Sequence, residues 1–368
     1  MIRSISQWWD GFTGRNHASV AVPVMDGTLK PNRRLDEGVV LLQLPGLDGV
    51  IVLGQQIWVS AGQHLWHVES GQATSCFDAQ APITALTASP DGHVLVAIDG
   101  RRVVELDVAD PRAPEPRRAW APQASENVMG INAIHCAPDG AWYLSVGARE
   151  READQWRQDL MSLGRSGRLL RVDPDTGVVA IQASQLPYAY GVLARAHDCL
   201  VSSSWGHRVM RIDAQGQQHA FTQELPAYPS RMVAASDGGV WLTCFAARTQ
   251  LVEFVLREPG YRRKMMAEMH PDHWICPALS SGKSFLEPLQ GAGVKTMGVL
   301  KPWAPPRSYG LVLRLDAQGQ VVESLHSLVD GQHHGITDVA ACQDGLLVVS
   351  KGSGSLLLVS SMGGAVNG

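Results

Sequence analysis

Residues 83–107, ITALTASPDGHVLVAIDGRRVVELD, decide the fold of this chain. Apolar and polar residues alternate here with the period of two that is typical of a half-buried β-strand. Asp-Gly pairs at 91–92 and 99–100 interrupt the alternation, and both residue types tolerate the positive φ of a short hairpin. The stretch therefore predicts three antiparallel strands joined by tight turns.

The same unit recurs along the chain. A turn signal followed by an apolar strand appears at 138–146, 197–203, 236–244 and 343–350, and a weaker copy covers 48–68. Third strands of basic and apolar alternation end at Asp173, Asp213 and Asp316, where an Asp side chain can bond turn backbone. A repeated unit of this kind is typical of propeller blades. We count six copies and predict an all-β fold, a six-bladed β-propeller.

Segments outside the repeat complete the predicted organisation. Residues 38–44 are apolar and are expected to add the outer strand of the last blade, which closes the ring without free edges. Residues 1–46 are thus an N-terminal extension with a ring-closing strand, and 47–362 are the propeller. A charged, helix-compatible insertion at 149–166 lies in blade three. A longer one at 257–308, in blade five, is the candidate lid because long insertions in compact scaffolds often cover binding sites.

Composition limits the classes of partner. The formal net charge is -4, without the basic patch that nucleic-acid binding requires. No segment has the length of apolar sequence that a membrane-spanning helix needs. We expect a cytoplasmic protein with a small-molecule substrate and reduced cysteines, and with no nucleic-acid or membrane partner. The oligomeric state stays open.

Several motifs carry a resemblance to a known superfamily. They are SGRLLRVDP at 166–174, LPYAYGV at 186–192, LPAYP at 225–229, DGGVW at 237–241 and YGLV at 309–312. Together they resemble the strictosidine synthase-like and gluconolactonase-like (SMP-30) six-bladed propellers, over most of the chain from about residue 48 to 360. That superfamily includes lactonases, phosphotriesterases and a condensing enzyme.

The resemblance implies a cation site with an altered set of ligands. Metal-dependent members hold a calcium-type ion at the bottom of the central cavity, on side chains from the starts of the inner strands. Asp48 and Asn132 match two of these ligands. Tyr190 replaces the Asn of the fourth blade, and Ser230-Arg231 replaces an Asp-Asn pair of the fifth. A cation beside Arg231 would meet a repelling charge. The expected cofactor is therefore either none or a divalent, calcium-type cation.

The same positions suggest a site that works without metal. Arg231 can bind a carboxylate or a developing oxyanion, and Tyr190 can donate a hydrogen bond. His333 or His334, just before the last inner strand, is the candidate general base, with Asp48 or Asp338 orienting it. The competing interpretation is that both histidines, and Asp48, only satisfy backbone. Asn132 can likewise be a structural link.

These residues favour a hydrolase that acts on a small lactone or ester in the propeller cavity. Two alternatives stay open. One is a metal-free condensing or lyase-type enzyme closer to strictosidine synthase, and the other is a non-catalytic propeller that binds a small molecule. The basic run near residues 261–269 favours an anionic ligand in each case.

Overall fold

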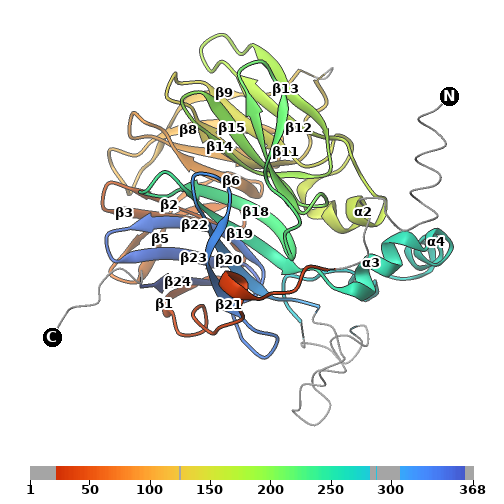
Figure 1. The fold of residues 1–368 in the computed structure, drawn as a ribbon. Helices are drawn as coiled ribbons and strands as arrows, with labels where there is room; N and C mark the ends of the chain where they lie inside the picture. The colour runs from red at the N-terminus through yellow and green to blue at the C-terminus, as the bar shows by residue number, and fades with distance from the viewer. Residues whose placement is uncertain (1–21, 124–125, 282–286, 288–306, 361–368) are drawn as a thin grey trace.

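The structure, a computed structural model, describes residues 22–123, 126–281, 287 and 307–360. The strands in these ranges form six four-stranded antiparallel sheets, which confirms the predicted six-bladed β-propeller. Figure 1 shows the sheets arranged around one axis. The inner strand of each sheet packs against the inner strand of the next, and the last packs against the first.

Five blades are built from four consecutive strands each. The first three are β2 (Leu47–Leu53), β3 (Gln56–Ala61), β4 (His64–Glu69) and β5 (Gln72–Asp78); β6 (Ile83–Ala88), β7 (Val94–Ile98), β8 (Arg102–Asp107) and β9 (Glu115–Trp120); and β10 (Ile131–Cys136), β11 (Trp142–Val146), β12 (Gly167–Val172) and β13 (Val179–Leu186). The next two are β14 (Ala189–Ala194), β15 (Asp198–Ser203), β16 (Arg208–Asp213) and β17 (Gln218–Thr222); and β18 (Ala227–Ala234), β19 (Val240–Ala247), β20 (Gly310–Leu315) and β21 (Val321–Ser327).

The sixth blade joins the two ends of the chain. Its strands are β22 (Ile336–Cys342), β23 (Gly345–Ser350), β24 (Ser355–Val359) and β1 (Val39–Gln43). The N-terminal strand β1 pairs antiparallel with β24, with Val40 opposite Leu357. The segment before it, which includes the short helix η1 (Gly27–Leu29), runs along β21, where Asn32 donates to the carbonyl of Ser324 at 2.9 Å. The ring is therefore closed by strand pairing between distant parts of the sequence.

The turns have the geometry that their residues favour. Asp99 and Gly100 have φ values of 55° and 61°, so both residues of this two-residue turn are left-handed, as the Asp-Gly pair predicts. Gly92, at the preceding turn, has φ of 84°. These turns bring successive strands back in register.

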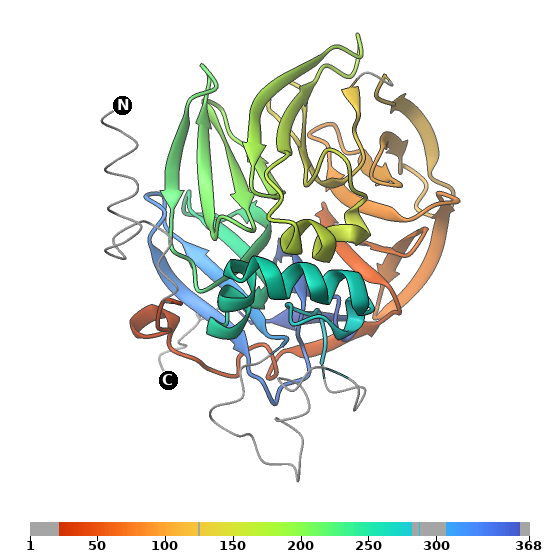
Figure 2. The same ribbon diagram turned by 90° about the vertical axis from the view of Figure 1, so that its right-hand side faces the viewer.

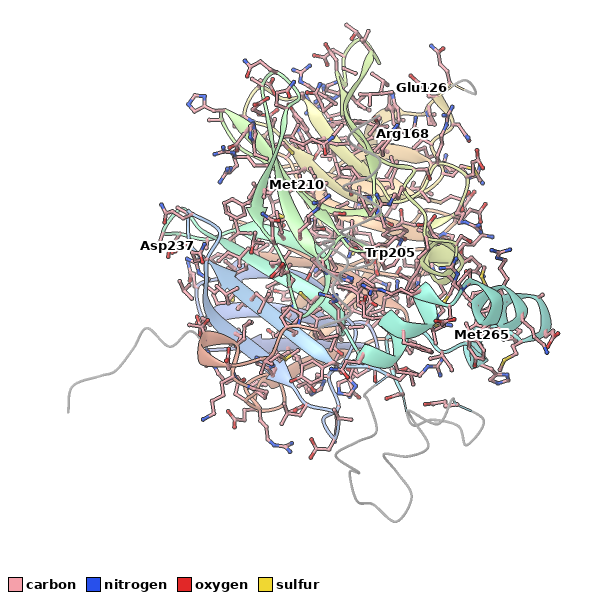
Figure 3. The ribbon with its side chains drawn as sticks, turned by 45° about the vertical axis from the view of Figure 1, so that its right-hand side comes forward. Glu126, Arg168, Trp205, Met210, Asp237 and Met265 are labelled. Atoms are coloured by element: carbon pink, nitrogen blue, oxygen red, sulfur yellow. The ribbon has the colours of Figure 1, made fainter. Side chains whose placement is uncertain are left out.

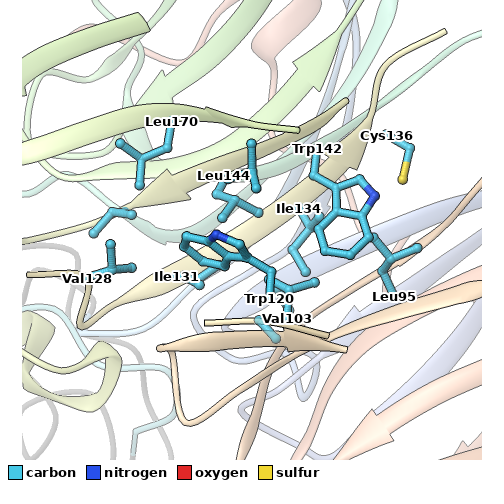
Figure 4. Close-up of a cluster of buried hydrophobic side chains, with 14 residues drawn as sticks. Leu95, Val103, Trp120, Val128, Ile131, Ile134, Cys136, Trp142, Leu144 and Leu170 are labelled. Carbon is cyan, nitrogen blue, oxygen red and sulfur yellow. The ribbon is translucent and has the colours of Figure 1, made fainter. Parts of the chain in front are cut away.

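Neighbouring blades pack through large apolar side chains. Between blades two and three, Trp120 from β9 and Trp142 from β11 lie beside Leu95, Ile134 and Leu144 (Figure 4). Trp142 is 2% exposed. Burial of such side chains stabilises the fold by about 1.5–3 kcal/mol each, so the blades are held to one another by their faces and the inner strands are held rigidly around the axis.

Both insertions follow the second strand of their blade and emerge on one face of the ring. The first carries η3 (Ala153–Gln155) and α2 (Trp156–Met161), and the second carries α3 (Gln250–Arg257), α4 (Pro259–Glu268) and η4 (Pro271–His273). Figure 2 shows these helices in front of the blades, over the axis. Residues 282–286 and 288–306 of the predicted lid, and residues 1–21 of the predicted extension, lie outside the described ranges.

The blade-five insertion begins earlier than its predicted start at residue 257. The chain leaves the sheet after Ala247, and Thr249 caps α3 by accepting a hydrogen bond from Val252 N. The apolar run of α3 resembles a strand in sequence, but Val252 and Val255 are buried on one helical face. No helix in the described ranges is long and apolar enough to cross a membrane.

Candidate functional site

A cavity of about 370 Å³ lies on the propeller axis, on the face that carries the two insertions. Its lining comes from all six blades and from both insertions. Its members are Gly46, Asp48, Gly62, Pro82, Ile83, Thr84, Asn132, Ala153, Asp154, Trp156, Arg157, Tyr188, Tyr190, Arg231, Phe245, Leu279 and Lys351. Its volume is at the lower end of the range for small-molecule sites.

Each of the six inner strands has a register irregularity at its start, next to this cavity. The irregularities fall between positions 47/49, 83/85, 131/133, 189/192, 229/232 and 336/338. A bulge re-aims the side chain of the residue it leaves unpaired. The unpaired residues include Asp48, Thr84, Asn132, Tyr190, Arg231 and Thr337, so one residue from every blade lies in a ring around the axis.

Arg231 lies at the centre of this ring. Its Nε donates to Asn132 O at 2.9 Å and its Nη1 to Asp48 O at 2.8 Å. Its Nη2 donates to Asp48 Oδ2 at 2.7 Å and to Thr84 O at 2.6 Å. A guanidinium has five N–H donors, and these bonds use four of them. Arg231 therefore joins the inner strands of blades one, two, three and five and has little capacity left for a ligand.

The charge of Arg231 is compensated from two sides. Its side chain is 6% exposed, and Asp338 Oδ2 lies 3.9 Å from Nη1. Burial alone would lower the pKa of Arg231, but Asp48 and Asp338 outweigh burial and raise it. Tyr190 places its ring 5.7 Å from the guanidinium carbon, within cation–π range. The guanidinium is therefore permanently charged.

Asp48 is shared between Arg231 and Lys351. Its Oδ2 pairs with Arg231 at 2.7 Å and its Oδ1 with Lys351 Nζ at 2.6 Å. Burial tends to raise the pKa of Asp48, but the two cations prevail and hold it at about 2. The carboxylate is thus ionised, fully paired and a poor base.

Lys351 is a cationic donor on the floor of the cavity that has hydrogen-bonding capacity left for a ligand. It follows β23, and burial, which lowers its pKa, is outweighed by Asp48, so the pKa is raised. The side chain is 38% exposed, because it faces the cavity. An ammonium has three donors, and one is used by Asp48. Sequence reasoning missed this residue; the available signal was a single Lys at the end of an apolar second strand, on the same face as the insertions.

One wall of the cavity is aromatic. Trp156 from α2, Tyr188, Tyr190 and Phe245 line it. Trp205, labelled in Figure 3, lies behind this wall, and its ring centroid is 4.5 Å from that of Tyr188. The Trp205 Nε1 donates to the Asp159 carboxylate of α2 at 2.8 Å. Burial raises the pKa of Tyr190 although Arg231 opposes this. The Tyr190 hydroxyl is therefore protonated at neutral pH and can donate.

The predicted histidines do not join this group. His334 places Nδ1 2.7 Å from Ser308 Oγ and Nε2 2.6 Å from Leu328 O, while His333 Nδ1 lies 3.2 Å from Ser353 Oγ. Neither lines the cavity, and burial lowers the pKa of both. They lie in the loop before β22, where Gly335 (φ of 65°) turns the chain against Leu279. The expected base role has no geometric support in the described residues.

Asp338 also lies behind the ring. Its Oδ2 accepts from Val50 N at 3.1 Å and its Oδ1 from Val339 N at 3.0 Å. Burial raises the pKa of Asp338 to about 7, against the opposing effect of Arg231. The bulge between Ile336 and Asp338 brings Thr337 to the ring instead, where its hydroxyl donates to Asp48 O at 2.9 Å. Asp338 was predicted to orient a histidine base, whereas in this register its carboxylate accepts from the backbone of Val50 and Val339.

The ring does not fit a divalent cation. Calcium needs six to eight oxygen ligands, whereas the Asp48 carboxylate and the carbonyls of Thr84 and Asn132 already accept from Arg231. The Asn132 side chain donates to Ala189 O at 2.9 Å. Within the described ranges, no group of three or more His, Cys, Asp or Glu residues is placed to hold a metal. The two predicted ligands are thus structural partners of Arg231.

The protein is therefore a six-bladed propeller in which Arg231 lies at the centre of the inner strands and a small cavity lies next to this arginine. Strictosidine synthase-like 7 of Arabidopsis thaliana is 25% identical over 135 residues, 36% of each chain. Human adipocyte plasma membrane-associated protein is 22% identical over 268 residues, 66% of this chain and 64% of that protein. The matches thus span a third to under two thirds of these relatives. No family model matches the sequence.

Solved structures agree on the fold. A gluconolactonase from Xanthomonas campestris superposes with a TM-score of 0.55 at 13% identity, covering 86% of this chain and 87% of that one. A regucalcin from Agrobacterium tumefaciens, described as a calcium-binding protein, gives 0.54 at 13% identity over 88% and 93%. The chain is thus similar in sequence to strictosidine synthase-like 7 and to adipocyte plasma membrane-associated proteins, and it shares the six-bladed fold of these gluconolactonase and regucalcin structures.

Proposed function

We propose that this chain hydrolyses a small ester or lactone in the central cavity without a metal ion. The observation that carries the proposal is the Lys351 ammonium, which faces the cavity with donors to spare and is held by an ionised Asp48. Arg231 supplies the fixed positive charge beneath it. Tyr190 lines the same cavity with a protonated hydroxyl.

In the proposed reaction, water gives one proton to solvent, the resulting hydroxide adds to the carbonyl carbon, and the carbonyl oxygen becomes an oxyanion. Lys351 and Tyr190 donate to that oxygen as charge develops, the kind of stabilisation that lowers barriers in acyl transfer. The intermediate then breaks the bond to the alkoxide, which takes a proton from water. A carboxylic acid and an alcohol, or a hydroxy acid from a lactone, are released.

Ligand binding without turnover is the second candidate. The observation in its favour is that Asp48 has both oxygens engaged and a pKa of about 2. No histidine lines the cavity in the part of the chain described. A base that accepts the proton of water would therefore have to be hydroxide or solvent.

The test is a panel of lactones and esters assayed with the wild-type chain and with Lys351→Met and Tyr190→Phe. We expect turnover to fall at least tenfold in each variant because each removes a donor to the oxyanion. The rate should rise with pH up to and beyond the ordinary pKa of lysine, since the pKa of Lys351 is raised and its proton is kept. A plateau near pH 7 would indicate a histidine base.

Matched controls are Lys30→Met, at an exposed site, and Tyr143→Phe, in a groove between blades three and four. Both should retain wild-type turnover. Equal rates in Lys351→Met and the wild type would contradict the proposal. No turnover on any ester or lactone would favour the binding function.

A further inference from the structure

The aromatic wall is one edge of a continuous cluster of rings. Trp156 meets Phe245 edge-on at 5.3 Å between centroids, and Phe245 stacks on Tyr190 at 5.9 Å. The ring centroids of Tyr190 and Tyr188 are 6.1 Å apart. Each ring is thus fixed by its neighbours. Such rigid rings bind a flat apolar group at low cost in entropy, because few rotamers are lost.

The cluster is anchored to the insertions as well as to the blades. Trp205 and Asp159 fix α2, and Met265, labelled on α4 in Figure 3, is 3% exposed and belongs to the same apolar cluster. Arg157 reaches from α2 to Asp272 of η4 at 2.6 Å, so the two insertions are tied together at the cavity. The aromatic wall is therefore in place before any ligand enters.

Blades one and two contribute a part of the lining with few side-chain atoms. It includes Gly46, Gly62 and Pro82, which lie outside the strands, and Ile83, the first residue of β6. Gly46 and Gly62 have φ of 78° and 58°, so turn backbone forms part of this surface. The aromatic wall and this part of the lining together bound a space with rings and with backbone, which suits a planar group.

The charges of the cavity select the sign of the ligand. The lining holds three cationic side chains, Arg157, Arg231 and Lys351, and two carboxylates, Asp48 and Asp154. Both oxygens of Asp48 are bonded to cations, so of these two carboxylates only Asp154, which is exposed on the first insertion, could pair with an amine. The ammonium of Lys351, by contrast, makes one hydrogen bond within the described residues, to Asp48. Its other donors can therefore bind an anion.

We infer that the cavity takes a planar aromatic ligand that carries a carboxylate, with the ring against Tyr188, Trp156 and Phe245 and the carboxylate on Lys351 and Tyr190. This rests on the donor pair of the proposed function and names its substrate class: esters of aromatic carboxylic acids, or lactones whose carbonyl is bonded to an aromatic ring, because their hydrolysis leaves an aromatic carboxylate. The cavity volume of about 370 Å³ accommodates one or two fused rings.

The test is equilibrium binding, by calorimetry and by tryptophan fluorescence, to the full chain. The probes are 2-naphthoate, its saturated analogue decahydronaphthalene-2-carboxylate, and 2-naphthylmethylamine. We expect 2-naphthoate to bind at least tenfold more tightly than the saturated acid and the amine not to bind at the same concentrations. Tyr190→Phe and Lys351→Met should each weaken 2-naphthoate at least fivefold, and Trp156→Leu should abolish the preference for the aromatic acid.

Two variants show whether weaker binding comes from the lost contact or from a loss of folding. Tyr190→Phe keeps the ring, and Trp241→Phe, in a groove between blades five and six, is a control that should bind like the wild type. Equal affinity for the saturated acid, binding of the amine, or no binding of 2-naphthoate at millimolar concentration would overturn the inference. Binding of 2-naphthoate without turnover of any ester would refute the hydrolase and leave the inference standing. Turnover of aliphatic lactones without 2-naphthoate binding would do the reverse.

Discussion

Replacing Arg231 by methionine should lower the free energy of unfolding by about 3–5 kcal/mol, because breaking this buried ion-pair network leaves Asp48 with Lys351 alone and takes away the cation that faces Asp338. The loss includes the bonds from Arg231 to Asn132 O, Thr84 O and Asp48. Circular dichroism or scanning calorimetry should show a melting temperature lower by about 5–15 °C. Arg231→Lys should be intermediate, because an ammonium keeps the charge but cannot reach all four acceptor groups.

A double-mutant cycle measures the interaction energy between Asp48 and Arg231 apart from their contacts with other residues. Asp48→Asn combined with Arg231→Met should be less destabilised than the sum of the single variants, since the two mutations remove both charges of the Asp48–Arg231 pair together. Arg263→Met, at an exposed position of α4, is the matched control and should melt like the wild type. Strictly additive effects, or a stable Arg231→Met variant, would show that Arg231 does not hold the inner strands together.

Replacing Gly191 by alanine should also be strongly destabilising, by about 1–3 kcal/mol or more. An added Cβ would lie 2.8 Å from Arg231 Cα and nearer still to the carbonyl oxygen of Ser230. Both atoms belong to backbone, so the inner strands of blades four and five would have to separate. That shift would also carry Arg231 away from its acceptors, and we expect cavity ligands to bind more weakly.

Gly260 provides the control for this change. It lies in α4, its φ is not in the left-handed region, and an added Cβ meets nothing within 4 Å. Gly260→Ala should therefore be neutral or stabilising by up to about 1 kcal/mol, because alanine is the better helix former. Denaturant unfolding of both variants checks the pair of expectations. A Gly191→Ala variant as stable as Gly260→Ala would mean that the inner strands tolerate displacement.

The fold was predictable because its signals are local and repeated. Strand alternation and Asp-Gly turns depend on a few adjacent residues, so each blade carries its own pattern. The start of α3 was not predictable in this way, because its run of apolar residues suits a strand as well as a buried helix. Only the Thr249 cap and the packing of Val252 and Val255 decide between the two.

The site was predicted in part, for a different reason. Asp48, Asn132, Tyr190 and Arg231 all line the axial cavity, where the pattern shared by their blades puts them, while the roles predicted for them stay predictions. The bond partners of Arg231 are mostly backbone carbonyls from other blades, and no sequence pattern specifies these. A role for Arg231 in binding substrate stays a prediction, although the protein itself already uses four of its five N–H donors.

Residues near the ring were harder to place than those in it. A shift of one position in β22 exchanges Thr337 for Asp338 at the axis, because side chains alternate between the two faces of a strand. His333 and His334 precede that strand in a loop whose direction depends on packing against Leu279. Lys351 was missed because the turns after second strands carry no motif of their own.

The guanidinium of Arg231 lies where the sequence resemblance predicted a calcium-type cation. The most direct test is the divalent metal content of the purified wild-type chain, measured with its melting temperature in chelator and in added calcium. We predict far less than one ion per chain and the same melting temperature in both conditions. One tightly held ion per chain, whose removal by chelator lowers the melting temperature, would contradict the account.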